Sequence, residues 1–277
     1  MKVLEHPLAR YIRPSARRTA QCPGCGNGIV AQSILRAFGQ MGKSLDEFVF
    51  VSGIGCSAWI PSPFFYADVL HTTHGRPIAF ATGVKLALPD KKVMVISGDG
   101  DLTAIGGNHL IHAARRNIDM VVVCINNGIY GMTGGQMAPT TPITLQTVTS
   151  PYGNIENAFD ISRLVIAAGA SFVARWTTFH ARNLTNTVKK ALQHKGFSFI
   201  EVVSQCPVQF GRRTGMGSAV DMMQHYRESS VPPRRAANMS PEEIRGKTIV
   251  GELLDIDKPE FTAELQQLLD RVSQEAR

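Results

Sequence analysis

Five short apolar runs constrain the fold of this chain more than any other feature. They are rich in Val, Ile and Phe, and they are Phe48–Val51, Val93–Ser97, Met120–Ile125, Ser171–Ala174 and Phe197–Val203. Continuous runs of this kind are typical of strands buried on both faces of a parallel sheet. Stretches with helical periodicity separate them: Asn27–Met41, Pro77–Leu88, Thr103–Arg116, Ile155–Ala168 and Phe179–His194. The alternation predicts an α/β domain with a mostly parallel sheet flanked by helices.

The length of the chain allows one large domain and a smaller appendage. It has 277 residues, of which 44% are hydrophobic and 18% are charged, which excludes a disordered chain. We predict an α/β domain over residues 1–210 and a C-terminal arm over residues 211–277. Gly211–Asn238 shows no period, whereas Ser240 and Pro241 predict a helix start. An amphipathic helix is expected to follow, with an apolar face of Phe261, Leu265, Leu268, Leu269 and Val272.

One uncharged segment, Phe48–Ala67, is long enough to span a bilayer. It contains Gly53, Gly55, Pro61 and Pro63, which would interrupt a membrane helix, so no membrane span is expected. The N-terminal residues contain no apolar run typical of a signal peptide. We therefore expect a cytoplasmic protein whose five cysteines stay reduced and serve in metal binding or catalysis.

Positive charge is concentrated near the N-terminus. Residues 1–43 contain one acidic residue, Glu5, and seven basic residues, Lys2, Arg10, Arg13, Arg17, Arg18, Arg36 and Lys43. This segment is either a solvated arm or a docking surface for an acidic protein or subunit. Four later basic residues, Arg212, Arg213, Arg234 and Arg235, could add to such a surface. Nucleic acid is not expected as a partner, because no binding-module motif accompanies the charge.

Polar residues follow two of the expected strands directly. Gly98, Asp99 and Gly100 follow the run that ends at Ser97, and Asn126 and Asn127 follow Ile125. The carboxyl ends of parallel strands are where such folds bind ligands, and glycines allow a phosphate to approach the backbone closely. A carboxylate and an amide oxygen are ligands that suit Mg²⁺. The alternative is that both groups are ordinary turn residues, but their joint occurrence after two strands favours a site for a diphosphate and a divalent cation.

Four of the cysteines lie in polar or glycine-rich surroundings. Cys22 and Cys25 form a CxxC motif, Cys56 follows the first strand, and Cys206 follows the last one. A redox dithiol would need a strand before the CxxC motif, which the sequence does not predict. Structural zinc and a [4Fe–4S] cluster both remain open from the cysteines alone. Cys124 lies inside an apolar run, which predicts a buried structural thiol.

The motifs taken together resemble a known family. The block from Gly98 to Asn127 resembles the thiamine diphosphate signature, which opens with GDG and closes with NN about thirty residues later. CPGCG, GIGCS, GDGD, NNGIYGMTGGQ and QCP together resemble the β subunit of the 2-oxoacid:ferredoxin oxidoreductases, from Cys22 to Arg213. The resemblance implies a thiamine diphosphate-binding fold. TGGQ (residues 133–136) and PTTP (residues 139–142) are most similar to the 2-oxoglutarate branch.

The resemblance also implies roles for individual residues. Cys22, Cys25, Cys56 and Cys206 would hold one [4Fe–4S] cluster. Asp99, Asn127 and the carbonyl of Ile129 would bind Mg²⁺. The residues expected to line the thiamine diphosphate site are Ile54, Gly55, Cys56, Ser57, His74, Gly98, Asp99, Gly100, Asp101, Asn127, Ile129, Gly131 and Thr133. His74 and Arg76 are candidate catalytic residues, because a histidine and an arginine can bind a substrate carboxylate.

The implied reaction is the reversible oxidative decarboxylation of a 2-oxoacid with coenzyme A and ferredoxin. For 2-oxoglutarate the products are succinyl-CoA, CO₂ and reduced ferredoxin. Pyruvate or another 2-oxoacid is an alternative substrate, and a non-oxidative thiamine diphosphate enzyme with structural zinc is an alternative function. No carboxylate in the sequence is an evident activator of the cofactor. The resemblance implies that this group comes from an α subunit, which is therefore expected to complete the site. The expected assembly is a heterodimer or a dimer of heterodimers.

Overall fold

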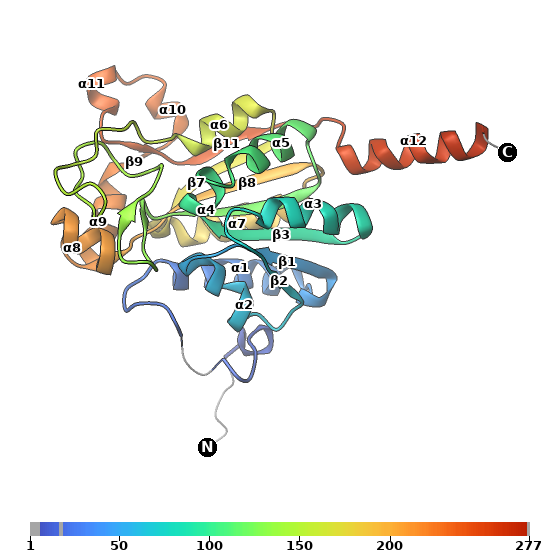
Figure 1. Ribbon diagram of the computed structural model, residues 1–277, viewed down its shortest axis with the longest axis horizontal. Helices are drawn as coiled ribbons and strands as arrows, with labels where there is room; N and C mark the ends of the chain where they lie inside the picture. Colours follow the sequence, from blue (N-terminus) through green and yellow to red (C-terminus); the bar gives the residue numbers. More distant parts are fainter. Residues whose placement is uncertain (1–5, 17–18, 276–277) are drawn as a thin grey trace.

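The computed structural model describes residues 6–16 and 19–275. Lys2, Glu5, Arg17 and Arg18 of the basic segment lie outside the described residues. The centre of the molecule is a seven-stranded sheet in the order β11-β7-β8-β4-β3-β1-β2, in which only β11 runs antiparallel to its neighbour (Figure 1). The predicted mostly parallel α/β fold is therefore confirmed. The strands are β1 Phe48–Ser52, β2 Val69–His71, β3 Lys92–Gly98, β4 Met120–Asn126, β7 Phe172–Thr177, β8 Phe197–Val203 and β11 Gly251–Asp255.

Helices cover both faces of the sheet (Figure 1). Two pack on one face, α1 (Asn27–Met41) and α7 (Ala181–Gln193), and three on the other, α3 (Pro77–Ala87), α5 (Gly107–Arg116) and α6 (Ile161–Ala168). Side chains of β4 alternate between these two cores, as the two-residue period of a strand requires. Val121, Val123 and Ile125 lie in the core beneath α1 and α7. Cys124 lies in the opposite core and is fully buried, which confirms the prediction for this thiol.

Two of the predicted helices begin later than their periodicity indicates. The stretch predicted as Thr103–Arg116 is divided, because α4 (Asp99–Thr103) ends at a turn and α5 starts only at Gly107. The helix predicted from Ile155 begins at Ile161, where the side chain of Asp160 accepts a hydrogen bond from the backbone N–H of Arg163. An aspartate in this position caps the first turn, so it fixes the start of the helix.

Residues 127–160 form mostly irregular structure between β4 and α6. The pair β5 (Ile129–Tyr130) and β6 (Gln136–Met137) makes a short antiparallel hairpin directly after the Asn127 turn. The residues after it fold back over the sheet edge, and the side chain of Asn154 donates hydrogen bonds to the carbonyls of Thr141 and Pro142. A further short helix, α2 (Pro61–Phe64), follows the Cys56 loop.

The segment after residue 210 contains more regular structure than its sequence indicates. The expectation of no period in Gly211–Asn238 is wrong, because α9 (Ala219–Ser229) lies within it and starts with a capping box between Ser218 and Asp221. The helix start predicted at Ser240 and Pro241 is confirmed. The other short elements are α8 Arg212–Thr214, β9 Ser230–Val231, α10 Pro233–Ala236, α11 Pro241–Ile244 and β10 Thr248–Ile249.

The end of the chain first joins the sheet and then leaves the body of the molecule. β11 pairs with β7, so part of the segment predicted as an arm extends the central sheet; the boundary at residue 210 stays a prediction. The predicted amphipathic helix is α12 (Phe261–Glu275), which projects away from the other elements (Figure 1). Thr262 is buried and Phe261 packs partly against the core, whereas Leu268, Leu269 and Val272 of its apolar face are exposed. Within residues 6–16 and 19–275, no helix combines the length and hydrophobicity that a membrane span needs.

Candidate functional site

A small cavity lies at the carboxyl edge of β1, β3 and β4, where their following loops meet. Its walls include every residue that the sequence analysis assigned to the thiamine diphosphate site. Those residues are Ile54, Gly55, Cys56, Ser57, His74, Gly98, Asp99, Gly100, Asp101, Asn127, Ile129, Gly131 and Thr133. Tyr130 and Met132 also line it. The parallel pairing of Ser97 with Cys124 and of Gly98 with Ile125 explains this, because it ends β3 and β4 at the same level.

Asp99 is one of two buried acidic residues that line this cavity. Its residue is 2% exposed, and the hydroxyl of Thr140 donates a hydrogen bond to Oδ2. Burial raises the pKa of the Asp99 carboxyl to about 6, although Thr140 and the backbone amides of Gly100 and Asn127 act in the opposite direction. The Asn127 turn therefore lies against the Asp99 carboxylate, as the sequence predicts. The side-chain oxygen of Asn127 accepts a hydrogen bond from the N–H of Ile129 at 3.1 Å.

Asp101 joins three loops around the cavity. Its Oδ1 lies 2.6 Å from Nδ1 of His74 and 2.7 Å from the backbone N of Gly75, and its Oδ2 accepts from Ser97 at 2.5 Å. The N–H of Ile54 also donates to Oδ1 at 3.3 Å. This close packing requires glycine at position 53, where a methyl group would lie 1.9 Å from Oδ2. Asp101 thus fixes His74 at the cavity wall.

The two candidate substrate residues are placed differently. His74 lines the cavity, and its side chain is 40% exposed. Arg76 is not among the lining residues; its guanidinium donates to the backbone oxygen of Ile105 at 3.0 Å. Arg76 therefore holds the loop after α4, and the structure does not bring it to the cavity with His74.

A buried network supports the asparagine turn from below. Glu201 on β8 accepts hydrogen bonds from Asn126 at 2.9 Å, from Ser162 at 2.5 Å and from Arg175 at 2.8 Å. Arg175 also forms an ion pair with Asp160 at the start of α6. The network ties β4, β7, β8 and α6 together immediately beneath the loop that contains Asn127. A paired buried charge of this kind fixes the geometry of its neighbours, because breaking one contact leaves the rest unsatisfied.

The four predicted cluster cysteines come from three separate segments that the fold brings together. A methyl group on Gly131 would lie 3.5 Å from Sγ of Cys206 and 3.7 Å from Sγ of Cys56. Burial raises the pKa of Cys25 to about 11 and that of Cys56 to about 12, and in both cases the other thiols of the group add to the effect. The group therefore borders the cavity, and Cys56 belongs to both.

Neighbouring polar residues hold these thiol loops in place. The side chain of Gln21 donates to the carbonyl of Cys56 at 3.0 Å and accepts from Asn27 at 2.8 Å. The backbone N–H of Gly26 donates to the carbonyl of Gln205 at 3.0 Å. These contacts connect the CxxC loop with the Cys56 loop on one side and with the Cys206 loop on the other.

Comparison with known proteins identifies the family. Residues 53–202 match the family model described as thiamine pyrophosphate enzyme, C-terminal TPP binding domain. The 2-oxoglutarate synthase subunit KorB of Methanocaldococcus jannaschii is 53% identical over 98% of this chain and 100% of its own length. The chain belongs to the β-subunit family of the 2-oxoacid:ferredoxin oxidoreductases. The KorB subunit of Archaeoglobus fulgidus, 48% identical over 94% of this chain and 93% of its own, agrees with this assignment.

A solved structure shows the same architecture. The chain is 33% identical to a chain of the 2-oxoglutarate:ferredoxin oxidoreductase from Magnetococcus marinus, with a TM-score of 0.85. The match covers 98% of this chain and 92% of that one. That structure contains 2-oxoglutarate, coenzyme A and succinyl-CoA. The thiamine diphosphate-binding fold predicted from the motifs is therefore confirmed.

The sequence analysis did not identify three residues that the structure places in or beside the site. Thr140 bonds to Asp99 from a loop far away in the chain. Tyr130 donates its hydroxyl to the carbonyl of Gly100 at 3.1 Å, and burial raises its pKa. Gln21 links two thiol loops. A threonine, a tyrosine or a glutamine gives no spacing signal by itself, although Thr140 and Tyr130 lie within the two motifs, PTTP and NNGIYG, that the resemblance used.

Proposed function

We propose that this chain is the thiamine diphosphate-binding β subunit of a 2-oxoglutarate:ferredoxin oxidoreductase. It converts 2-oxoglutarate, coenzyme A and oxidised ferredoxin into succinyl-CoA, CO₂ and reduced ferredoxin, and the reaction is reversible. The observation that supports this most directly is the shared position of Cys56, which lies in the cavity of Asp99 and Asn127 and also in the thiol group. The names of the KorB relatives and the ligands of the Magnetococcus structure favour 2-oxoglutarate over pyruvate or another 2-oxoacid.

The acidic part of the cavity fits Mg²⁺ and a diphosphate. Asp99, Asn127 and the carbonyl of Ile129 are the proposed Mg²⁺ ligands. Gly98, Gly100 and Asp101 border the space that the diphosphate would occupy. A carboxylate whose pKa burial raises to about 6 is stabilised by a cation, so the electrostatics of Asp99 suit a divalent ion.

The thiol group fits a [4Fe–4S] cluster better than structural zinc. In the part of the chain that the structure describes, no three His, Cys, Asp or Glu side chains are arranged to hold a single metal ion. A tetrahedral zinc site would need such an arrangement. A cluster instead spreads four thiolates over several iron atoms, which suits Cys22, Cys25, Cys56 and Cys206 on their separate loops.

Different residues of the chain would have different roles around the bound thiamine diphosphate and the cluster. Bound thiamine diphosphate would supply the electron sink for decarboxylation, and the cluster would supply a one-electron outlet. His74, which lies 2.6 Å from Asp101, would donate a hydrogen bond to a substrate carboxylate. With the α subunit in place, the uncharged walls formed by Ile54, Tyr130 and Met132 would limit the access of water to the reacting atoms.

The cavity is only part of a coenzyme site. It has a volume of about 70 Å³, whereas a pocket that encloses an organic ligand usually has about 300–1,000 Å³. Two large apolar side chains that line it, Ile54 and Met132, are exposed, and so are Trp59, three residues after Cys56, and Ile105, after α4. We propose that the α subunit covers these side chains, closes the site and contributes to binding 2-oxoglutarate and coenzyme A. The proposed complex is a cytoplasmic heterodimer or dimer of heterodimers, since four free thiols require a reducing compartment.

Anaerobic co-expression and purification of the chain with its α subunit tests this proposal. We expect thiamine diphosphate, four iron atoms and four sulfide ions per chain, together with 2-oxoglutarate-dependent reduction of a viologen dye. Zinc without sulfide, with decarboxylation but no dye reduction, would instead support the non-oxidative alternative. Full activity of the chain alone would contradict the shared site. If the complex oxidised pyruvate faster than 2-oxoglutarate, pyruvate would replace 2-oxoglutarate as the proposed substrate.

A further inference from the structure

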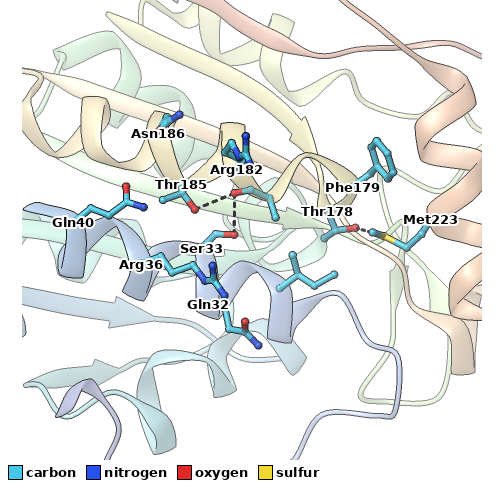
Figure 2. Close-up of a pocket in the computed structure, with 12 residues that line it drawn as sticks. Gln32, Ser33, Arg36, Gln40, Thr178, Phe179, Arg182, Thr185, Asn186 and Met223 are labelled. Carbon is cyan, nitrogen blue, oxygen red and sulfur yellow. Dashed lines mark hydrogen bonds between the residues drawn. The ribbon is translucent and has the colours of Figure 1, made fainter. Parts of the chain in front are cut away.

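A second, larger hollow lies on another part of the molecule. It is a groove of about 500 Å³ between α1 and α7, on the face of the sheet opposite α3, α5 and α6 (Figure 2). The helices are joined at its base, where the hydroxyl of Ser33 donates to the carbonyl of Ala181 at 3.4 Å. Figure 2 shows Arg36 on the α1 wall and Arg182 on the α7 wall. None of the proposed cofactor ligands lines this groove.

The charge of the groove has one sign. Arg36 and Arg182 are exposed, and neither side chain makes a hydrogen bond or ion pair within the described residues. Lys189 adds a third cation, which lies 2.9 Å from the Gln40 side chain at the groove wall. Neither α1 nor α7 contains an aspartate or a glutamate. A cationic concave surface of this kind attracts an acidic partner.

One end of the groove lies beside the thiol group. Thr178, which lines that end, donates its hydroxyl to Oε1 of Gln205 at 2.5 Å. Gln205 precedes Cys206, and its carbonyl accepts a hydrogen bond from Gly26, which follows Cys25. Thr178 therefore connects this end of the groove to the residue before Cys206 and, through the Gln205 carbonyl, to the residue after Cys25.

The same end offers an apolar anchor point. The ring of Phe179 is 43% exposed there, next to the half-buried side chain of Met223 (Figure 2). Aromatic and methionine side chains are enriched at protein–protein contacts relative to the rest of the surface. A site for a small anion would not need an exposed aromatic ring.

We propose that the α1–α7 groove docks the electron carrier, an acidic protein of the ferredoxin type, with Arg36 and Arg182 steering it and Phe179 seating it beside the thiol group. This inference rests on the proposed function. The docking surface would then lie on two helices that flank the sheet. Arg36, one of the basic residues of the N-terminal segment, would belong to the α1 side of this groove.

The test compares two electron acceptors in the anaerobic α–β complex. The variant R36E/R182E is assayed with ferredoxin and with methyl viologen, and R163E on α6 serves as the matched control, because Arg163 is an exposed arginine on the opposite face. We expect the KM for ferredoxin to rise about tenfold at low ionic strength in R36E/R182E, and the difference to shrink as salt is added. The viologen rate and the KM for coenzyme A should not change. F179A should raise the KM for ferredoxin at every salt concentration.

Several results would overturn the inference. An unchanged KM for ferredoxin in R36E/R182E, or an equal rise in R163E, would remove the groove as the docking surface. A raised KM for coenzyme A would make it a site for a small anion, and a changed mass of the complex would make it a subunit interface. A wild-type complex that reduces no viologen with any 2-oxoacid and coenzyme A would instead end the proposed function, and this inference with it.

Discussion

At the scale of single residues, burying the charged form of Asp99 has an energetic cost. Its carboxylate is buried among hydroxyl and amide donors, and burial raises its pKa to about 6 from an ordinary value of 3.8. A raised pKa means that the folded chain binds the proton more tightly than the unfolded chain does. The stability contributed by this group is therefore fully present below pH 3.8 and is lost as the pH rises through about 6. A bound cation would compensate for this loss at neutral pH.

Replacing Asp99 by asparagine should separate stability from function. At pH 8 we expect the cofactor-free complex of D99N to be more stable than wild type, on the order of 2 kcal/mol, because no charge remains to be buried. Thiamine diphosphate and Mg²⁺ should no longer stay bound after gel filtration. The check is the thermal midpoint of both stripped complexes at pH 8 and pH 4. If the two cofactor-free complexes had the same thermal midpoint at pH 8, other groups of the protein would already stabilise the Asp99 charge.

Thr140 should tune the same carboxylate. T140V removes the hydroxyl that donates to Asp99 Oδ2 but keeps the shape of the side chain. We expect the apparent affinity for Mg²⁺ to fall about tenfold, which is typical when a group behind a metal ligand is lost. The matched control is T147V, since Thr147 is a buried threonine of the same loop that bonds to Ser150 instead. Equal affinities in the two variants would contradict a role for Thr140.

At the scale of elements, the two ends of the central strands have different tasks. The carboxyl ends of β3 and β4 form the cavity of Asp99 and Asn127, which is the proposed cofactor site. The amino ends contain a buried charge cluster, in which Asp119, just before β4, pairs with Lys92 on β3 and with Lys85 on α3. Lys85 lies 2.9 Å from Asp119 Oδ2, and both side chains are almost fully buried. Changes at this end should affect folding and leave the chemistry intact.

Asp119 provides the corresponding experiment. D119N leaves two buried lysines without their carboxylate, so we expect the free energy of unfolding to fall by about 3–5 kcal/mol. D90N, at an exposed aspartate in the nearby turn, should have little effect. Denaturant unfolding of the complex measures both. The thiamine diphosphate content at low temperature should equal that of wild type, and a loss of cofactor in D119N would show that the two ends are coupled.

The elements that the sequence predicts are those with a strong hydrophobic period. Helix α1 has the predicted bounds, and β4 and β8 agree within a residue, because nearly every side chain in these strands is buried. The edge strand β2 was missed because it has three residues and is largely exposed. Helix α9 was missed because few of its side chains, Met222 and Tyr226 among them, are buried. Short elements on the periphery depend on tertiary contacts that a local period does not contain.

At the scale of the whole molecule, residues that are far apart in the chain complete the site. Physical reasoning from the residues alone found Asp99 and Asn127, because strand ends predict where polar side chains gather. The family resemblance added Ile54, His74 and the four-cysteine set. Neither found Thr140 as a partner of Asp99, because that contact exists only after residues 127–160 fold over the sheet edge.

The projecting C-terminal helix should contribute little to the stability of the body. A chain that ends at residue 266 keeps Phe261, which packs against the core, and loses the exposed Leu268, Leu269 and Val272 of α12. We expect the thermal midpoint of the complex to change by less than about 2 °C, because surface residues usually contribute little. Differential scanning calorimetry measures this. A larger decrease would show that α12 packs against the α subunit in the complex.

Because Cys56 belongs to both the cavity and the thiol group, oxygen should inactivate the enzyme in a particular way. The turn at Gly55 and Cys56 is both a wall of the proposed coenzyme cavity and one side of the proposed iron site. Oxygen that strips the iron would free this side and open the wall at the same time. Bleaching and release of the vitamin-derived coenzyme should therefore proceed together, and repair of a damaged preparation should require iron, sulfide and coenzyme in one mixture.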